Sequence, residues 1–361
     1  MGKLASFCAV VAALTVGCGS SKGSTSSGSS TGGTTTGAFV AGAVTTLAGN
    51  GMRGRLDGSG GRDGQAEFSR PEGVAADSNG NVYVADTGDN CVRMIDPGGN
   101  VTTLENSVSF QGPSALAVDT QGYIYVAVAL NYQVWKINAA GASQILAGNG
   151  TPGDVNGLGG PDGPAEFFAP TGVAVDAAGN VYVSDHDRVR KIDTTINVST
   201  LAGNGTDGYV DGTGVEAEFS APRGLAVDAA GNVYVADSNN NRIRKIDPAG
   251  NVTTLAGNGT QGENDGSGGP DGGAEFYMPS GVAVDANGNV FVTDTGNELI
   301  RWIDASGNVT TWAGVAGVQS YGDATDALEA AFANPYGIGL MPDGGLVVAD
   351  DFNNCIRLIG P

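Results

Sequence analysis

Acidic side chains in glycine-rich segments are the residues of this chain best suited to binding chemistry. Three long segments, 151–166, 206–218 and 260–275, place Asp among many Gly residues. Oxygen ligands on such segments could hold a hard cation such as calcium, although the spacing is not that of an EF-hand loop. No other cofactor is predicted, and the alternative is a solvated rim of Asp-Gly turns. The candidate binding residues are Asp154, Asp162, Asp207, Asp211, Asp265 and Asp271.

The only histidine of the chain, His186, is the second candidate for chemistry. It stands between Asp185 and Asp187, and a histidine beside carboxylates can act as a general base or a metal ligand. A three-histidine zinc site is excluded because there is no second histidine. No other catalytic residue is predicted, and the alternative for His186 is an incidental, exposed side chain.

The segments that position these residues repeat along the chain. The most regular unit, 222–259, has four short apolar runs separated by turns rich in Gly and Asn. Four antiparallel strands in units of about 40 to 60 residues are typical of β-propeller blades. The sequence therefore predicts an all-β fold, a six-bladed β-propeller. The first half of the unit recurs from Pro71, Pro113, Pro170, Pro279 and Pro335.

The two ends of the repeat region predict how the ring closes. The sixth unit stops after its third apolar run, 355–359, and the missing fourth run, 43–50, precedes the first unit. We expect this N-terminal strand to pair with the last blade, because closure removes the exposed edge of an open sheet. The propeller would then occupy 43–361.

The repeated motifs resemble NHL repeats. They read Val-Ala-Val-Asp, then Gly-Asn-Val-Tyr-Val-Ala-Asp, then Asn-x-Arg-Ile-Arg-Lys-Ile-Asp, and they recur over the whole chain after residue 42. The resemblance implies a module for molecular interactions. Blade two departs most, since Val128 replaces the second-strand Asp and Trp135 replaces the third-strand Arg. Blade six has Met341 where the others carry the first Asp.

Residues that recur in every blade are predicted to serve the fold. The Asp that ends each second strand can bond the amides of its own turn, and the third-strand Arg suggests hydrogen bonds from blade to blade. Each Phe-x-x-Pro motif predicts a core wedge before an inner strand. The recurrent pairs are Asp86 and Arg93, Asp185 and Arg190, Asp237 and Arg244, Asp294 and Arg301, and Asp350 and Arg357.

Cys91 and Cys355 occupy the same repeat position in blades one and six, which are neighbours in the ring. Third strands lie at least two strand spacings, ~10 Å, beyond the innermost strand. A disulfide needs Cα atoms within about 7 Å. The geometry therefore predicts two buried thiols and no disulfide.

The first 17 residues resemble a bacterial lipoprotein signal peptide. Lys3 precedes an apolar run, 4–16, that is too short to span a membrane, and small residues lead to Cys18. The resemblance implies cleavage before Cys18 and lipid attachment to its sulfur, although Thr15 stands where an aliphatic residue is usual. Residues 18–42 form a linker rich in Gly, Ser and Thr that behaves as a flexible coil. The alternative is an ordinary secretory signal with an incidental cysteine.

The charge balance restricts the partners. The 361 residues carry 17 Lys and Arg against 38 Asp and Glu, a net charge of -21, which argues against nucleic acid as a ligand. Because Gly19 rather than Asp follows the cysteine, the resemblance implies the outer membrane, with the lipid as the only membrane contact.

These features together predict a monomeric, surface- or periplasm-facing lipoprotein. It would act as a non-catalytic binding scaffold for an envelope or extracellular protein, peptide or glycan through its acidic loop face. The alternative is a metal-dependent propeller enzyme, similar to gluconolactonases or virginiamycin B lyase, with its site over the central channel. We expect a binding protein rather than an enzyme.

Overall fold

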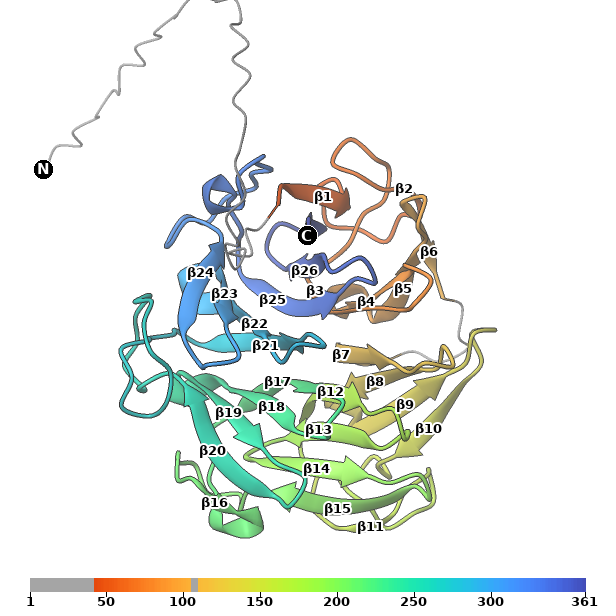
Figure 1. Cartoon of the computed structure of the whole chain (residues 1–361). Coiled ribbons are helices and arrows are strands. Elements are labelled where there is room, and N and C mark those ends of the chain that lie inside the picture. The colour runs from red at the N-terminus through yellow and green to blue at the C-terminus, as the bar shows by residue number, and fades with distance from the viewer. Residues whose placement is uncertain (1–41, 105–109) are drawn as a thin grey trace, which may run out of the picture. The chain divides into compact units, whose positions relative to one another are not determined.

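The computed structural model describes residues 42–104 and 110–361. Six antiparallel sheets surround a common axis (Figure 1), and each sheet is one blade. The predicted all-β, six-bladed propeller is confirmed. The signal peptide, Cys18 and most of the linker lie outside the described residues. Within the described part, no helix is long and apolar enough to span a membrane.

Each blade contains four main strands, numbered outward from the axis. The inner strands are β3 (Pro71–Ala76), β7 (Pro113–Val118), β12 (Pro170–Val175), β17 (Pro222–Val227), β21 (Pro279–Val284) and β25 (Pro335–Leu340). The second strands are β4 (Val82–Asp86), β8 (Ile124–Val128), β13 (Val181–Asp185), β18 (Val233–Asp237), β22 (Val290–Asp294) and β26 (Leu346–Asp350). The third strands are β5 (Cys91–Ile95), β9 (Gln133–Ile137), β14 (Arg188–Ile192), β19 (Arg242–Ile246), β23 (Leu299–Ile303) and β27 (Cys355–Ile359).

The outermost strands carry short additions. The fourth strands are β6 (Asn100–Thr103), β10 (Ser143–Ala147), β15 (Asn197–Ala202), β20 (Asn251–Ala256), β24 (Val309–Ala313) and, in blade six, β1 (Val44–Ala48). Blades one, three and four gain a fifth strand from β2 (Gly58–Ser59), β11 (Gly157–Leu158) and β16 (Gly212–Thr213). The 3-10 helices are η1 (Thr87–Asp89), η2 (Ala129–Asn131), η3 (Gly214–Glu216), η4 (Ser238–Asn240), η5 (Thr295–Asn297) and η6 (Ala327–Glu329).

The second strands form the centre of each blade and are buried on both faces. All five residues of β18, for example, are buried, as are all five of β22. A strand between two layers is covered on both sides, so it reads as a continuous run of Val, Ile, Ala and aromatic residues rather than an alternating pattern.

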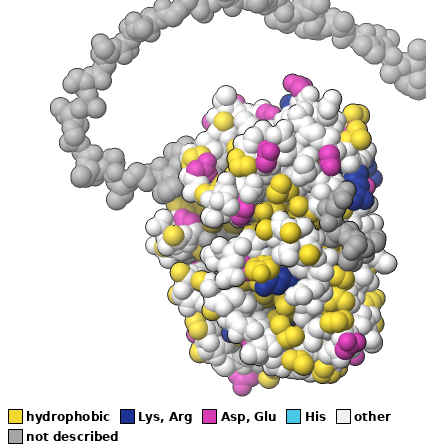
Figure 2. All heavy atoms as spheres, turned by 90° about the vertical axis from the view of Figure 1, so that its right-hand side faces the viewer, with side chains coloured by type: hydrophobic (Ala, Val, Ile, Leu, Met, Phe, Trp, Pro, Cys, Tyr) yellow, Lys and Arg dark blue, Asp and Glu magenta, His cyan; other side chains and the backbone are white. Residues whose placement is uncertain are grey.

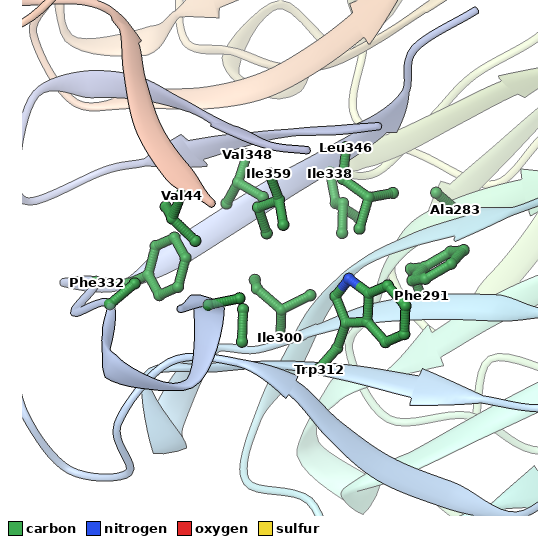
Figure 3. Packing of buried hydrophobic residues seen from close by; sticks show 13 residues of the cluster. Val44, Ala283, Phe291, Ile300, Trp312, Phe332, Ile338, Leu346, Val348 and Ile359 are labelled. Atoms are coloured by element: carbon green, nitrogen blue, oxygen red, sulfur yellow. The ribbon is translucent and has the colours of Figure 1, made fainter. Parts of the chain in front are cut away.

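The N-terminal strand closes the ring as predicted. β1 pairs antiparallel with β27, and Val44 lies opposite Ile359. Val44 is fully buried and belongs to one apolar cluster with Phe332, Ile359 and Ile300 (Figure 3). The first and last described strands are therefore held by both backbone hydrogen bonds and core packing.

A buried ion pair links the second and third strands in five blades. In blade four, Arg244 Nη1 donates to Asp237 Oδ2 over 2.7 Å, and neither side chain is exposed. Asp237 Oδ1 also accepts the backbone N–H of Ser220 over 2.8 Å. A buried carboxylate with both oxygens bonded meets the usual condition for keeping a charge inside a protein.

The same guanidinium holds the long loop that precedes its blade. Arg244 Nη1 donates to the Glu218 carbonyl, and Nη2 donates to the Val210 carbonyl and to Asp211 Oδ1 over 2.7 Å. The guanidinium carbon lies 5.1 Å from the centre of the Phe219 ring. The sequence suggested that this arginine bonds from blade to blade. Its bonds go instead to the loop that connects blades three and four, and we call this arrangement of one buried arginine, its Asp and the loop a clamp. The same clamp is built around Arg93, Arg190, Arg301 and Arg357.

Blade two replaces this clamp with apolar packing. Val128 and Trp135 are both buried, and Trp135 packs edge-on against Phe110 with ring centres 5.7 Å apart. The connection into this blade, 104–112, is much shorter than the connection 148–169 into blade three. A short connection leaves no long loop to hold, which accounts for the loss of both charged residues.

Cys91 and Cys355 are buried free thiols, as the repeat geometry predicted. Burial raises the pKa of the Cys91 thiol to about 12, so this sulfur stays protonated at physiological pH.

We expect Arg244→Met to lower the free energy of unfolding by ~3–5 kcal/mol, because it leaves the Asp237 carboxylate buried without its partner. The neighbouring variant Lys245→Met removes a cation from the same strand and should cost less than ~1 kcal/mol. Urea denaturation followed by circular dichroism measures both. A double variant, Asp237→Val with Arg244→Trp, copies blade two and should recover part of the loss. Equal losses in Arg244→Met and Lys245→Met would contradict the clamp.

Candidate functional site

The candidate site lies at one end of the propeller. On this side, which we call the loop face, inner strands begin, second strands end and the long connections between blades start and finish. Strand direction alternates within each sheet, so the other turns emerge on the opposite face.

Six residues line the central channel near the loop face, each directly after the proline that starts an inner strand. We call them the axial ring. This position carries a small hydroxyl residue in three blades and Glu, Arg or Tyr in the other three. The axial ring consists of Glu72, Ser114, Thr171, Arg223, Ser280 and Tyr336.

Arg223 and Tyr336 form the polar centre of this ring. Arg223 Nη1 donates to the Tyr336 hydroxyl over 2.8 Å and reaches Ser280 Oγ at 3.4 Å. The guanidinium carbon also lies 5.2 Å from the centre of the Tyr336 ring. Burial raises the pKa of Tyr336 to about 12, so its hydroxyl keeps its proton at neutral pH.

Glu72 brings a carboxyl group into the same channel. Burial, together with the nearby Asp351 carboxylate, raises its pKa to about 7, although Arg70 and Arg223 act in the opposite direction. Asp351 itself is fully buried and forms a bidentate ion pair with Arg70, whose Nε and Nη2 each lie 3.1 Å from one carboxylate oxygen. Glu72 is therefore the axial-ring group whose charge changes near neutral pH.

A hollow of about 570 Å³ opens at the loop face between blades three and four. Its polar lining includes Arg223 and Tyr336 of the axial ring, together with His186, Asp187 and Asp207. Apolar wall is supplied by Ala169, Ala221 and Pro222. This volume lies within the range typical of small-molecule sites. The remaining lining residues, Thr171, Ser220 and Asn239, are polar.

His186 lies at the edge of this hollow, in the two-residue turn between β13 and β14. Its backbone adopts a left-handed conformation with φ of 56°, and its ring lies against that of Phe168 with the centroids 4.7 Å apart and the planes tilted by 60°. Nδ1 lies 3.3 Å from Asp187 Oδ2, while Asp187 Oδ1 accepts the Ala221 N–H. The side chain is 47% exposed, so the imidazole can meet a ligand.

The structure does not bring the six acidic loop residues together. Asp211 and Asp265 are held by the clamp arginines Arg244 and Arg301. Asp154 pairs with Arg188 over 2.8 Å. Asp207 alone lines the hollow.

Asp162 and Asp271 are exposed, and the loops that carry them pair with the outermost strands β15 and β24. The turn that contains Asp162 begins at Gly159, whose N–H bonds the carbonyl of Ile196 in a turn of the opposite face. The long loops of blades three and four add β11 and β16 to the outer strands β15 and β20, so these loops run along the outer edges of their blades. Figure 2 shows acidic side chains scattered over one side of the molecule rather than gathered in a single patch.

Within residues 42–104 and 110–361, no group of three His, Cys, Asp or Glu side chains is arranged to hold a metal ion. A role for the six acids in binding calcium or a partner therefore remains a prediction, and no cluster of these side chains among the described residues supports it.

Sequence reasoning missed Glu72, Arg223 and Tyr336. The available signal was the variation at one fixed repeat position, directly after each inner-strand proline. That signal has meaning only once the second residue of the inner strand is known to face the axis, where six separate chain segments meet.

Comparison with known proteins agrees with the repeat and the fold. A family model described as the Teneurin NHL domain matches residues 43–209, and the NHL repeat model matches 219–246 and 276–303. The fold defines a six-bladed β-propeller. Its blades are NHL repeats.

Two relatives show how far the similarity extends. SUPPRESSOR OF QUENCHING 1, a chloroplastic protein of Arabidopsis thaliana, is 30% identical over 72% of this chain and 27% of its own length. NHL repeat-containing protein 2 of Bos taurus is 28% identical over 66% of this chain and 39% of its own length. The chain thus spans less than half the length of these curated relatives.

Solved structures share the fold at low sequence identity. An auxiliary nutrient binding protein of Bacteroides thetaiotaomicron has a TM-score of 0.67 at 18% identity, over 88% of this chain and 76% of its own. A gluconolactonase of Xanthomonas campestris has a TM-score of 0.57 at 13% identity, over 88% and 89%. Virginiamycin B lyase of Staphylococcus aureus has a TM-score of 0.51 at 13% identity, over 81% and 95%. At these identities the likeness concerns the fold alone.

The raised pKa of Glu72 gives a testable dependence of stability on pH. Because the folded pKa of about 7 exceeds the ordinary 4.5, stability is lost as pH rises through this window. We expect Glu72→Gln to be more stable than the parent by ~2 kcal/mol at pH 8.5 and to match it near pH 4.5. Urea titrations at both pH values measure the difference, and a gain of equal size at both would contradict the assignment.

Proposed function

We propose that this protein is a non-catalytic binding domain whose ligand enters the hollow at the loop face. One observation carries this proposal: the groups that break the six-fold repeat, Arg223, Tyr336 and His186, meet in a hollow with apolar walls. A scaffold needs only five clamps and a closed ring, and none of these three residues is part of a clamp. Their convergence favours recognition of a ligand.

The size of the hollow favours a small molecule, or the end of a peptide or glycan. The solved structures of similar fold include proteins named for nutrient binding, which is consistent with this use of the loop face. The proposal moves the binding surface from the acidic loops as a whole to the hollow between blades three and four.

The export of the protein is part of the proposal. We infer that Cys18 is lipidated and that the linker 18–42 holds the propeller away from the membrane, in the periplasm or at the cell surface. A propeller on such a tether samples soluble ligands while staying in the envelope, with the outer membrane as the expected location.

An enzyme of the gluconolactonase or virginiamycin B lyase type is the second candidate. His186 in the hollow and the fold neighbours favour it. The described residues do not offer a metal-ligand cluster beside His186, which favours binding instead. Turnover of a lactone or a streptogramin by the purified protein, with or without added divalent metal, would overturn the binding proposal.

Filling the hollow tests the proposed site. Ala169→Trp places a large ring in its wall, and we expect it to abolish binding of fragments found by ligand-observed NMR with the parent protein. The control Ala230→Trp makes the same change in an exposed turn of the opposite face and should leave binding intact. Fragments that bind both variants equally well would show that the hollow is not the site.

Replacement of Cys18 tests the tether. We expect Cys18→Ser to lose incorporation of labelled palmitate and to leave the membrane fraction, because the lipid needs the sulfur. Cys8→Ser changes a cysteine within the signal peptide and should remain lipidated. A Cys18→Ser protein that still fractionates with membranes would contradict the lipoprotein assignment.

A further inference from the structure

Arg223 differs from every clamp arginine in what surrounds its guanidinium. The clamp arginines are fully buried and paired with carboxylates, whereas Arg223 donates from Nη1 to two hydroxyl groups. Among the described residues, none forms an ion pair with Arg223 or accepts a hydrogen bond from its Nε or Nη2. The guanidinium therefore faces the hollow with donors free on one edge.

Tyr336 complements these donors. Its hydroxyl accepts the Arg223 bond at 2.8 Å, so the hydroxyl proton is free to point elsewhere, and it is donated to no residue in the described part of the chain. A charged guanidinium beside a neutral phenol gives two kinds of donor directed at one place. Such a pair suits a carboxylate, whose two oxygens can each take a hydrogen bond.

The charge around the hollow limits the ligand to a single negative charge. Asp187 and Asp207 line the hollow, and Glu72 faces Arg223 from across the channel. One cation near three acids leaves no net positive charge, so a carboxylate has to be held by direct hydrogen bonds from Arg223 and Tyr336. A dianionic phosphate would meet more repulsion than attraction.

We propose that Arg223 and Tyr336 are the anion-binding end of the site, and that its ligand is a small organic acid bound through one carboxylate, with its apolar body against Ala169 and Pro222. This inference rests on the proposed function, since it assigns the ligand class of the same hollow.

Glu72 couples this binding to protons. When ionised, its carboxylate competes with the ligand for the charge of Arg223, and when protonated it does not. The other charged or titratable groups that face Glu72 are Arg70, Asp351 and Tyr336. Arg70 and Asp351 form an ion pair, and Tyr336 stays uncharged. Glu72 is therefore the group whose ionisation changes the net charge near Arg223. Affinity for the carboxylate should rise as pH falls through about 7.

Benzoate is the probe for this proposal, titrated into the full-length protein by calorimetry and ligand-observed NMR. Its neutral, dianionic and cationic counterparts are benzamide, phenyl phosphate and benzylamine. We expect benzoate to bind best, Arg223→Gln to weaken it at least ~10-fold, Arg223→Lys to weaken it less, and Tyr336→Phe to weaken it by several-fold. Circular dichroism verifies that each variant is folded.

The pH arm compares pH 5.5 with pH 8.5. The parent should bind benzoate ~10-fold more tightly at pH 5.5, and Glu72→Gln should bind it equally at both. His186→Asn keeps a residue that tolerates the left-handed turn and should retain the pH dependence, which separates Glu72 from the histidine.

The outcomes separate the inference from the proposed function. Preferred binding of benzamide, benzylamine or phenyl phosphate that Ala169→Trp abolishes would overturn the carboxylate assignment and leave the hollow as a binding site. Benzoate binding unaffected by Arg223→Gln would overturn it as well. Absence of binding by all four probes would overturn the carboxylate assignment. The hollow would still stand as a binding site if fragments of other chemistry bound the parent protein and did not bind Ala169→Trp.

Discussion

The buried guanidinium of the third strand is the interaction on which the rest of this propeller depends. Each long connection between blades has almost no secondary structure of its own, yet its backbone carbonyls and one side chain converge on an arginine that is closed off from water. A charge in that position is tolerable only when every partner is in place. The clamp therefore fixes the loop, and the loops of blades three and four supply walls of the hollow.

Close approach of the inner strands is the second constraint. A Cβ atom on Gly224 would lie 2.5 Å from the carbonyl oxygen of Ser280, and one on Gly281 would lie 2.5 Å from that of Tyr336. Glycine follows the axial-ring residue in five blades because neighbouring inner strands touch there. The tight packing leaves a narrow channel, so the side chains of the axial ring are gathered within reach of one another.

The parts of the structure that follow from local pattern could be predicted from the sequence. Strand runs, turns and the displaced fourth strand of blade six are all visible in the repeat, because each depends on residues close together in the chain or on counting units. The course of the long loops depends on pairing that is distant in sequence, such as β11 with β15, and so the placement of Asp162 and Asp271 was not foreseen. The site was missed for a related reason: Arg223 and Tyr336 belong to different blades, and neither carries a motif that marks it.

A symmetric repeat acquires a specific site only where the repeat is broken. In this protein two departures from the repeat lie together: the short turn at His186 in blade three and the axial residue Arg223 in blade four. In blades one, two, four and five a 3-10 helix joins the second and third strands, whereas blade three has only the two-residue turn at His186. The hollow lies beside that shortened turn, off the axis, and Arg223 of the adjacent blade reaches it from the channel. The turn is separate from the Asp185–Arg190 clamp contacts, which remain intact in the same blade. Changing one turn and one axial residue can therefore create or alter a site without loss of the clamps, which explains how a stable repeat can carry a specific function.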